Sequence, residues 1–205
     1  MQFEGFNRKD FDTFSIEGLD DRMQAIQERI QPKFRTIGSV AADDLSGKIG
    51  NEMFLHIARH ARRTVNPPKD TWLALAANKR GYKQHPHFQI GLFDDHVFIW
   101  LAYIYELPNK KEIARTFLEN IETMQEAIPD DYVISLDHTK KDAVNFKEVN
   151  LTKALERFRD VKKAEFLVGR HIAANDPILQ DGKAFMQLVG NTLETLLPFY
   201  KMSLQ

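Results

Sequence analysis

The sequence predicts an α+β fold with a mainly antiparallel sheet packed by helices, and three observations predict it. The segment from Pro86 to Tyr105 contains two apolar runs that meet at Asp94-Asp95, which is typical of a β-hairpin. Amphipathic helical patterns precede and follow this segment. No repeat, low-complexity tract or linker divides the 205 residues, and 43% of them are hydrophobic. We therefore expect a single α+β domain spanning residues 1–205.

Two helices are expected before the hairpin. Apolar residues recur every three or four positions from Leu19 to Ile37, which predicts a helix, and Pro32 inside it predicts a kink or a break. A second helix is expected from Asn51 to Arg63, because apolar residues again follow a helical spacing and Asn66-Pro67-Pro68 ends it. His56 and His60 then lie one turn apart on one helical face.

Three strands are expected next, at Thr71–Ala77, Pro86–Phe93 and His96–Tyr105. The last of them is apolar on both sides, so it should be central in the sheet and covered on both faces. If Asp94-Asp95 form a two-residue turn, the register of the hairpin follows. The expected pairs are Phe93 with His96, Gly91 with Phe98, Gln89 with Trp100 and His87 with Ala102.

The C-terminal half alternates helical patterns with short strands. The expected elements are a helix from an Asn109–Glu112 capping box to Pro129, a strand at Tyr132–Leu136, a helix carrying Leu151 to Phe158, a strand at Ala164–Ile172, and a helix from Phe185 to Pro198.

Composition excludes several classes of protein. The net charge of −1 is far from that of a dedicated nucleic-acid-binding domain. The absence of cysteine excludes disulfides, thiolate nucleophiles and sulfur-ligated zinc. The longest apolar run, Val97–Tyr105, has nine residues, whereas a membrane helix needs ~20, so a cytoplasmic protein is expected. Nucleotide-binding loops and the common hydrolase motifs are absent, and neither an enzymatic reaction nor a cofactor can be named.

Positive charge is concentrated between Arg59 and Lys83. This stretch of 25 residues holds seven Lys or Arg and one acid, Asp70, so it carries an excess of six positive charges and the remainder carries about −7. A fixed cluster of cations and backbone donors suits phosphate or carboxylate. The alternative is a solvated loop that binds nothing.

Five runs of sequence resemble the YktB-like family, bacterial proteins of unassigned function. They are HARRTVNPP (60–68), NKRGYK (78–83), PHFQIGL (86–92), DHTK (137–140) and VKKAE (161–165). The resemblance covers nearly the whole chain. It implies an α+β fold with a mainly antiparallel sheet, similar to the catalytic architecture of biotin ligases and class II synthetases, and it assigns no catalytic residue.

The leading hypothesis for function is a cleft that binds a small anionic ligand. Gly81 and Gly91 would let the ligand approach the backbone, and two charged contacts would need added stacking on Trp72, Tyr82 or Trp100 to reach micromolar affinity. A ligase- or transferase-like enzyme acting on an acyl or nucleotidyl group is the alternative, and a nucleic-acid adaptor ranks third because the acidic remainder repels a long polyanion. The predicted ligand-binding residues are Arg62, Arg63, Lys79, Arg80, Tyr82, Lys83, His87 and Gln89.

Two other histidine patterns favour structural interpretations. His56 and His60 have the spacing of a zinc pair, but the adjoining basic residues repel a cation, so no metal site is expected. Asp137 next to His138 suggests a general base, yet adjacent residues rarely orient one another. An exposed polar loop is the preferred interpretation of this DHTK run.

Overall fold

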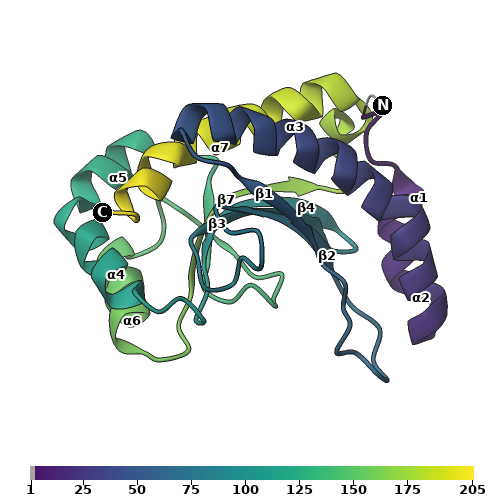
Figure 1. Cartoon of the computed structure of the whole chain (residues 1–205), viewed down its shortest axis with the longest axis horizontal. Helices are drawn as coiled ribbons and strands as arrows, with labels where there is room; N and C mark the ends of the chain where they lie inside the picture. Colours follow the sequence, from purple (N-terminus) through teal and green to yellow (C-terminus); the bar gives the residue numbers. More distant parts are fainter. Residues whose placement is uncertain (1–2) are drawn as a thin grey trace.

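The computed structural model describes residues 3–205 and places seven strands in one sheet, in the order β1-β2-β3-β4-β7-β5-β6 (Figure 1). Every neighbouring pair in this sheet is antiparallel. The strands are β1 (Phe54–Ile57), β2 (Thr71–Ala76), β3 (His87–Leu92), β4 (His96–Tyr103), β5 (Val133–Ser135), β6 (Val144–Asn145) and β7 (Phe166–Ala173). The predicted α+β class with an antiparallel sheet is confirmed.

Helices lie before, between and after the strands. The α-helices are α1 (Arg8–Asp12), α2 (Leu19–Ala25), α3 (Gln31–Ile49), α4 (Lys110–Glu119), α5 (Ile121–Ala127), α6 (Leu151–Asp160) and α7 (Gly182–Met202). A π-helical turn, Ile26–Ile30, joins α2 to α3, and short 3₁₀ turns occupy Thr13–Ser15 and Pro177–Gln180. Among the described residues, no helix is both long and apolar enough to cross a membrane.

The hairpin of β3 and β4 has the predicted register. Gly91 pairs with Phe98, Gln89 with Trp100 and His87 with Ala102. Strand β4 lies between β3 and β7, and all eight of its residues are buried. The predicted central position of this strand is therefore confirmed, as expected for a run that is apolar on both sides.

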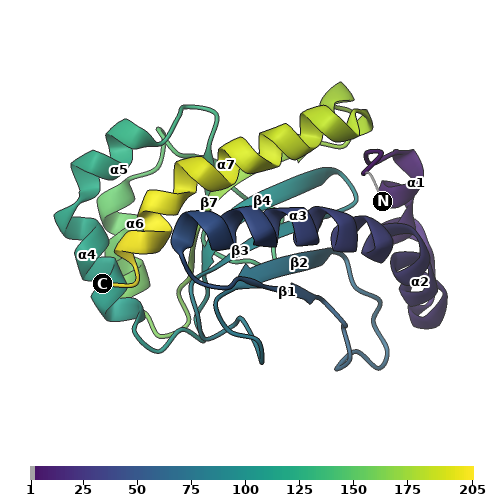
Figure 2. The ribbon, with the colours of Figure 1, turned by 45° about the horizontal axis from the view of Figure 1, so that its top comes forward.

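The two faces of the sheet are covered differently. Helices α3 and α7 lie along one face, where the main core forms (Figures 1 and 2). Tyr103 of β4 donates a hydrogen bond to the carbonyl oxygen of Phe199 in α7 (3.2 Å). Of residues 3–205, loops rather than helices lie beneath the opposite face (Figure 1). This loop-covered face carries a smaller apolar cluster that includes Phe98, Trp100 and Leu167. It also carries the polar side chains of β3.

The prediction of a helix from Asn51 to Arg63 was wrong. Gly50 ends α3 with a left-handed φ of 78°, and residues 54–57 then form the edge strand β1, which pairs with β2 from Phe54↔Ala76 to Ile57↔Leu73. The backbone hydrogen bonds that residues 54–57 form with β2 stabilise a strand more than the helical spacing of their apolar residues favours a helix. Residues 58–70 form a loop.

Both prolines that were expected to interrupt helices lie inside continuous helical structure. The π-helical turn directly precedes Pro32, at the start of α3, so the predicted irregularity is present as a wider turn rather than a break. Pro198 was expected to end the last helix, but α7 continues to Met202. Phe199 and Tyr200 are buried, and this packing stabilises the final turn beyond the proline.

The expected helix from Asn109 to Pro129 is divided in two at Asn120, between α4 and α5. The predicted capping box at its start is absent, because the side chain of Asn109 makes no capping hydrogen bond. The buried Lys110 instead anchors this helix start. Its Nζ donates hydrogen bonds to the carbonyl oxygens of Val161, Lys162 and Ala164 (2.7, 3.1 and 2.9 Å).

Candidate functional site

Three loops border the loop-covered face: the β1–β2 loop (residues 58–70), the β2–β3 loop (77–86) and the β5–β6 loop (136–143). They line two neighbouring hollows of about 760 and 590 Å³. The residues that define the first, here called the β2–β3 hollow, include His56, Arg59, Lys79, Arg80, Tyr82, Lys83 and Glu106. Those that define the second, the β1–β2 hollow, include Arg22, Arg63, Lys69, Asp70, Trp72 and His138.

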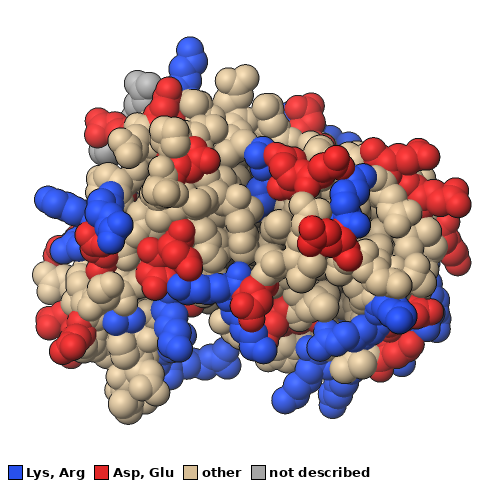
Figure 3. Space-filling model, turned by 180° about the vertical axis from the view of Figure 1, so that it is seen from behind, with Lys and Arg blue, Asp and Glu red and all other residues tan. Residues whose placement is uncertain are grey.

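Positive charge borders this side of the molecule. Figure 3 shows Lys and Arg side chains gathered along its lower edge, on both sides of an opening. In the β2–β3 hollow, Lys83 pairs with Glu106 at 3.3 Å, whereas Arg59, Lys79 and Arg80 form no ion pair with any Asp or Glu of residues 3–205. The hollow therefore keeps cations that its own acid does not neutralise.

The eight predicted ligand-binding residues are distributed over four places. Lys79, Arg80, Tyr82 and Lys83 line the β2–β3 hollow together. Arg63 lines the β1–β2 hollow, and Arg62 is exposed and lines neither. His87 and Gln89 are buried in β3, at 0% and 3% exposure.

Hydrogen bonds fix the β2–β3 loop. The side-chain oxygen of Asn78 accepts hydrogen bonds from the backbone N–H groups of Arg80 (2.8 Å) and Gly81 (3.3 Å). The carbonyl oxygen of Asn78 lies 2.8 Å from Nε2 of His56 in β1. Space around Gly81 is open, whereas the ring of Phe98 fills the space at Gly91, so the backbone is accessible at the first glycine only.

His87 and Gln89 support this loop from below. Nδ1 of His87 lies 2.7 Å from the carbonyl oxygen of His85, and Nε2 lies 2.9 Å from the side-chain amide of Gln89. Burial lowers the pKa of His87 to about 4, so the ring is neutral at neutral pH. The Tyr82 ring packs against His87 with 4.9 Å between ring centroids.

Two aromatic side chains are accessible at the hollows. Trp72 and Tyr82 are each half-buried, and the indole Nε1 of Trp72 donates a hydrogen bond to the Tyr82 hydroxyl (2.9 Å). Trp100 is only 4% exposed within the smaller apolar cluster. A flat ligand group can therefore stack on Trp72 or Tyr82, and not on Trp100.

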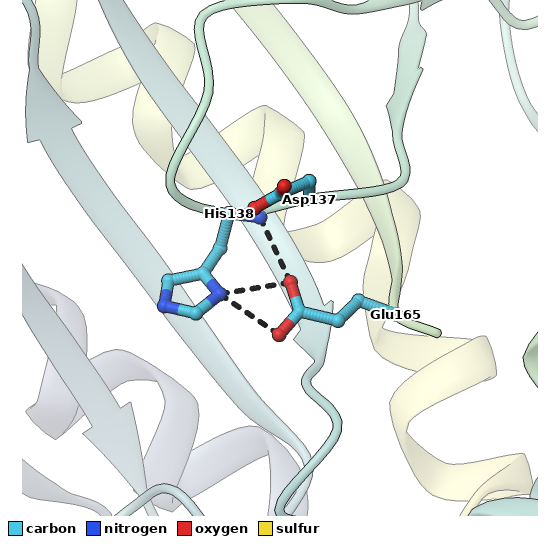
Figure 4. Close-up of side chains that lie close together, drawn as sticks. All are labelled: Asp137, His138 and Glu165. Carbon is cyan, nitrogen blue, oxygen red and sulfur yellow. Dashed lines mark hydrogen bonds and ion pairs between the residues drawn. The ribbon is translucent and has the colours of Figure 1, made fainter. Parts of the chain in front are cut away.

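The interpretation of DHTK as a merely exposed loop missed a buried contact. Nδ1 of His138 lies 2.9 and 2.8 Å from the two carboxylate oxygens of Glu165, which is 3% exposed, and the His138 backbone N–H donates to the same carboxylate (Figure 4). Burial by itself lowers the pKa of His138, but the bond to Glu165 outweighs it and the net pKa is raised. Nε2 of the ring points away from Glu165 (Figure 4).

Asp70 also lines the β1–β2 hollow and lies directly before β2. Arg22 of α2 fixes this segment by donating a hydrogen bond to the carbonyl oxygen of Pro68 (2.9 Å). Asp70 is 8% exposed, and its burial raises the pKa of the carboxyl to about 6, although Arg63 and His138 nearby favour the charged form. A carboxyl with this pKa is poised to exchange protons near neutral pH.

One group of three residues within 3–205 has the spacing of metal ligands: Asp137, His138 and Glu165, whose ligand atoms lie within 4.8 Å of one another. Nδ1 of His138 and the Glu165 oxygens are already joined by hydrogen bonds. Oδ1 of Asp137 accepts hydrogen bonds from the backbone and hydroxyl of Thr139. We therefore interpret His138 and Glu165 as a hydrogen-bonded pair rather than as a metal centre.

The zinc-pair geometry considered for His56 and His60 is absent, because the helix it required is not formed. His56 lies in β1, and His60 lies in the following loop with a left-handed φ of 50°. Nε2 of His60 lies 3.2 Å from the hydroxyl of Thr71, while His56 contacts Asn78. Both histidines act as structural contacts of the loops.

Comparison with known proteins identifies the family. Residues 6–200 match a domain of unknown function, DUF1054. The chain belongs to the DUF1054 family. It is 61% identical over 204 residues to a UPF0637 protein of Shouchella clausii, covering 100% of this chain and 97% of that protein. A UPF0637 protein of Listeria monocytogenes is 52% identical over 205 residues, with both chains fully covered. The resemblance to an uncharacterised bacterial family, seen in the sequence, is confirmed.

The sequence contained one indication of the His138–Glu165 pair that the sequence analysis did not use. His138 belongs to the DHTK run and Glu165 to the VKKAE run, two of the five runs that carry the resemblance. Their separation of 27 residues gives no local pattern, and only the sheet brings them together, since β5 pairs with β7. Glu165, which lies between α6 and β7, thus contacts His138 of the β5–β6 loop from behind.

Replacing Asp70 with asparagine is expected to stabilise this DUF1054 protein above pH 6. The carboxyl has a pKa of about 6 in the folded chain against its ordinary value of 3.8, so the folded state binds more protons between these values. Stability therefore falls as the pH rises through this window, by up to about 3 kcal/mol. Asp70→Asn should exceed wild type by about 1–3 kcal/mol at pH 8 and by little at pH 3.5.

Denaturant unfolding of both proteins at the two pH values measures the difference. Because the comparison is between two proteins at each pH, the titration of all other groups cancels to first order. A variant that is equally stable or less stable than wild type at pH 8 would contradict the buried, charged state of Asp70.

Proposed function

We propose that this DUF1054 protein binds a small anionic ligand, bearing phosphate or carboxylate, in the β2–β3 hollow. The observation that supports this most is the set of cations Arg59, Lys79 and Arg80, which line one hollow without an acidic partner among residues 3–205. Like charges held together without a counter-ion disfavour the folded state, and a bound anion relieves that repulsion.

The fixed loop strengthens the proposal. Because Asn78 holds the backbone of Arg80 and Gly81, part of the entropy of ordering the site is lost on folding rather than on binding. The open space at Gly81 lets an anion approach the backbone. A solvated loop that binds nothing, the alternative interpretation, would not need the Asn78 hydrogen bonds.

Magnitudes favour a ligand with a flat ring or acyl portion as well as an anionic group. Two charge-assisted contacts contribute at most ~6 kcal/mol, whereas micromolar affinity requires about 8 kcal/mol. Tyr82, which lines this hollow and accepts a hydrogen bond from the indole of Trp72, is the accessible ring that can supply the difference by stacking. Inorganic phosphate alone should therefore bind weakly, and adenosine monophosphate more tightly.

Removing two cations of the hollow is expected to weaken binding about 10- to 100-fold, because each charged contact contributes roughly 1.5–3 kcal/mol before screening by salt. The variant is Lys79→Ala with Arg80→Ala, and the measurement is isothermal titration with inorganic phosphate, pyrophosphate and adenosine monophosphate. Lys153→Ala with Lys183→Ala is the matched control, since both side chains are exposed on α6 and α7 and the change in net charge is the same. Equal affinities for the two double variants would contradict the proposal.

An enzymatic function is the second candidate. Action on an acyl or nucleotidyl group was the alternative that the sequence left open. The observation that favours chemistry over binding alone is that His138, which is bonded to Glu165, lines the same hollow as Asp70. A nucleic-acid adaptor stays third, because the charge outside residues 59–83 is about −7.

A further inference from the structure

The β1–β2 hollow is lined by the carboxyl of Asp70 and by the imidazole of His138, whose Nδ1 contacts Glu165 while its Nε2 faces away from that residue. Asp70 has no cationic group within 4.0 Å among residues 3–205, and Nε2 of His138 has no hydrogen-bond partner in the same part of the chain. The two residues come from different loops and line the same hollow. Each is held from behind, Asp70 through the Arg22–Pro68 contact and His138 through Glu165. A carboxyl and an imidazole from two different loops are therefore held in one hollow.

The surroundings decide which group is the base. Glu165 favours the imidazolium form of His138, whereas burial leaves Asp70 with a pKa of about 6. Glu165 thus makes His138 the better proton donor, and Asp70 is mainly ionised above pH 6, so we assign the acceptance of a proton to Asp70 and its donation to His138. The charged or titratable groups near Asp70 are Arg63, Tyr82 and His138, and those near His138 are Glu165, Asp137, Asp70 and His87.

The other residues of the hollow indicate the class of substrate. Arg63 and Lys69 supply positive charge, and Trp72 supplies a half-buried indole beside them. Cations stabilise the oxygens of a phosphate group during displacement at phosphorus, and an indole stacks on a nucleobase. A base, an acid, two cations and a stacking surface together suit a phosphodiester whose own neighbouring hydroxyl is the nucleophile.

We propose that the β1–β2 hollow cleaves the phosphodiester bond of a short oligoribonucleotide, with Asp70 as the general base and His138 as the general acid. Asp70 takes the proton of the 2′-hydroxyl, the 2′-oxygen forms a bond to phosphorus, and the bond from phosphorus to the 5′-oxygen breaks. Nε2 of His138 protonates that leaving oxygen. The products are a 2′,3′-cyclic phosphate and a 5′-hydroxyl, and both protein groups regain their starting protonation by exchange with water.

The charge of the molecule restricts the length of the substrate. The excess of six positive charges is confined to residues 59–83, and the remainder of the chain repels a long polyanion. The hollow of about 590 Å³ is of the size that holds one small ligand. This inference does not require ligand binding in the neighbouring β2–β3 hollow.

The test uses the full chain with a single-stranded hexaribonucleotide of mixed sequence, in buffer containing a chelator, and the deoxyribonucleotide of the same sequence. Wild type should cleave the RNA to cyclic phosphate products and leave the DNA intact. Asp70→Asn and His138→Gln should each slow cleavage at least about 100-fold, which is typical of losing a general acid or base. Lys153→Ala with Lys183→Ala should cleave like wild type. Loss of cleavage by Asp70→Asn and His138→Gln, purified identically, excludes a contaminating nuclease.

Two further measurements separate a catalytic role from a structural one. Asp70→Asn is expected to be more stable than wild type, so its loss of cleavage cannot result from unfolding. Glu165 is a positioning residue, and Glu165→Gln should move the basic limb of the pH–rate profile to lower pH, because it no longer favours the imidazolium. Absence of RNA cleavage by wild type, or equal rates for wild type and His138→Gln, would overturn the proposal. Phosphate binding is measured separately by titration, so the failure of one proposal is distinguishable from the failure of the other.

Discussion

Gly169→Ala is expected to lower the free energy of unfolding by about 3 kcal/mol or more, because overpacking between two central strands cannot be relieved by a side-chain rotation. Gly169 lies in β7 opposite Trp100 of β4. A Cβ atom added there would overlap the carbonyl oxygen of Ile99 and touch the indole of Trp100. Either β7 must move away from β4 or the hydrogen bonds between them must lengthen.

The matched control is the same substitution where space is free. A Cβ atom added at Gly190, inside α7, meets no atom within 4 Å. Gly190→Ala should stabilise the protein by roughly 0.5–1 kcal/mol, because alanine has the higher helix propensity. Denaturant unfolding of both variants is the measurement, and a Gly169→Ala protein as stable as wild type would show that β7 does not approach β4 this closely.

Trp100→Ala is expected to cost about 3–5 kcal/mol, the range for a large aromatic side chain removed from a core. The indole is 4% exposed and packs with Phe98 and Leu167 on the loop-covered face. Loops rather than helices cover this cluster. The decrease in the free energy of unfolding therefore measures how closely the loops pack against the indole. Tyr105→Ala is the comparison, because that ring is 44% exposed and its removal should cost less than about 1 kcal/mol. Similar losses for the two variants in thermal unfolding would mean that the cluster is not a core.

The sequence was sufficient where structure is set by neighbouring residues. The turn at Asp94-Asp95 fixes the register of β3 against β4, since each later pair follows by counting. The central position of β4 followed from its apolar residues on both sides. In the C-terminal half, the strand β5, the helix α6 and most of β7 lie within the expected ranges. These features depend on turn chemistry and on periodicity.

Features that depend on distant contacts were missed. Residues 54–57 have a pattern compatible with a helix, and only the free edge of β2 makes them a strand. The basic residues were predicted correctly as a local excess of charge, but periodicity could not show that Arg63 and Arg80 line different hollows. Glu165 could not be assigned to His138 because their contact depends on the pairing of β5 with β7. In each case the missing information was the order of strands in the sheet.

The unequal covering of the two sheet faces has a consequence for motion. Helices α3 and α7 cannot leave their face without exposing the main core, so that side opens only when the whole chain unfolds. The loops over the opposite face are held by a few hydrogen bonds, such as those of Asn78 and His138, and these can break and re-form while every strand pair stays intact. A molecule can therefore enter either hollow without cooperative unfolding of the protein. Substitutions in the loops can change the rate of binding while the sheet keeps its structure.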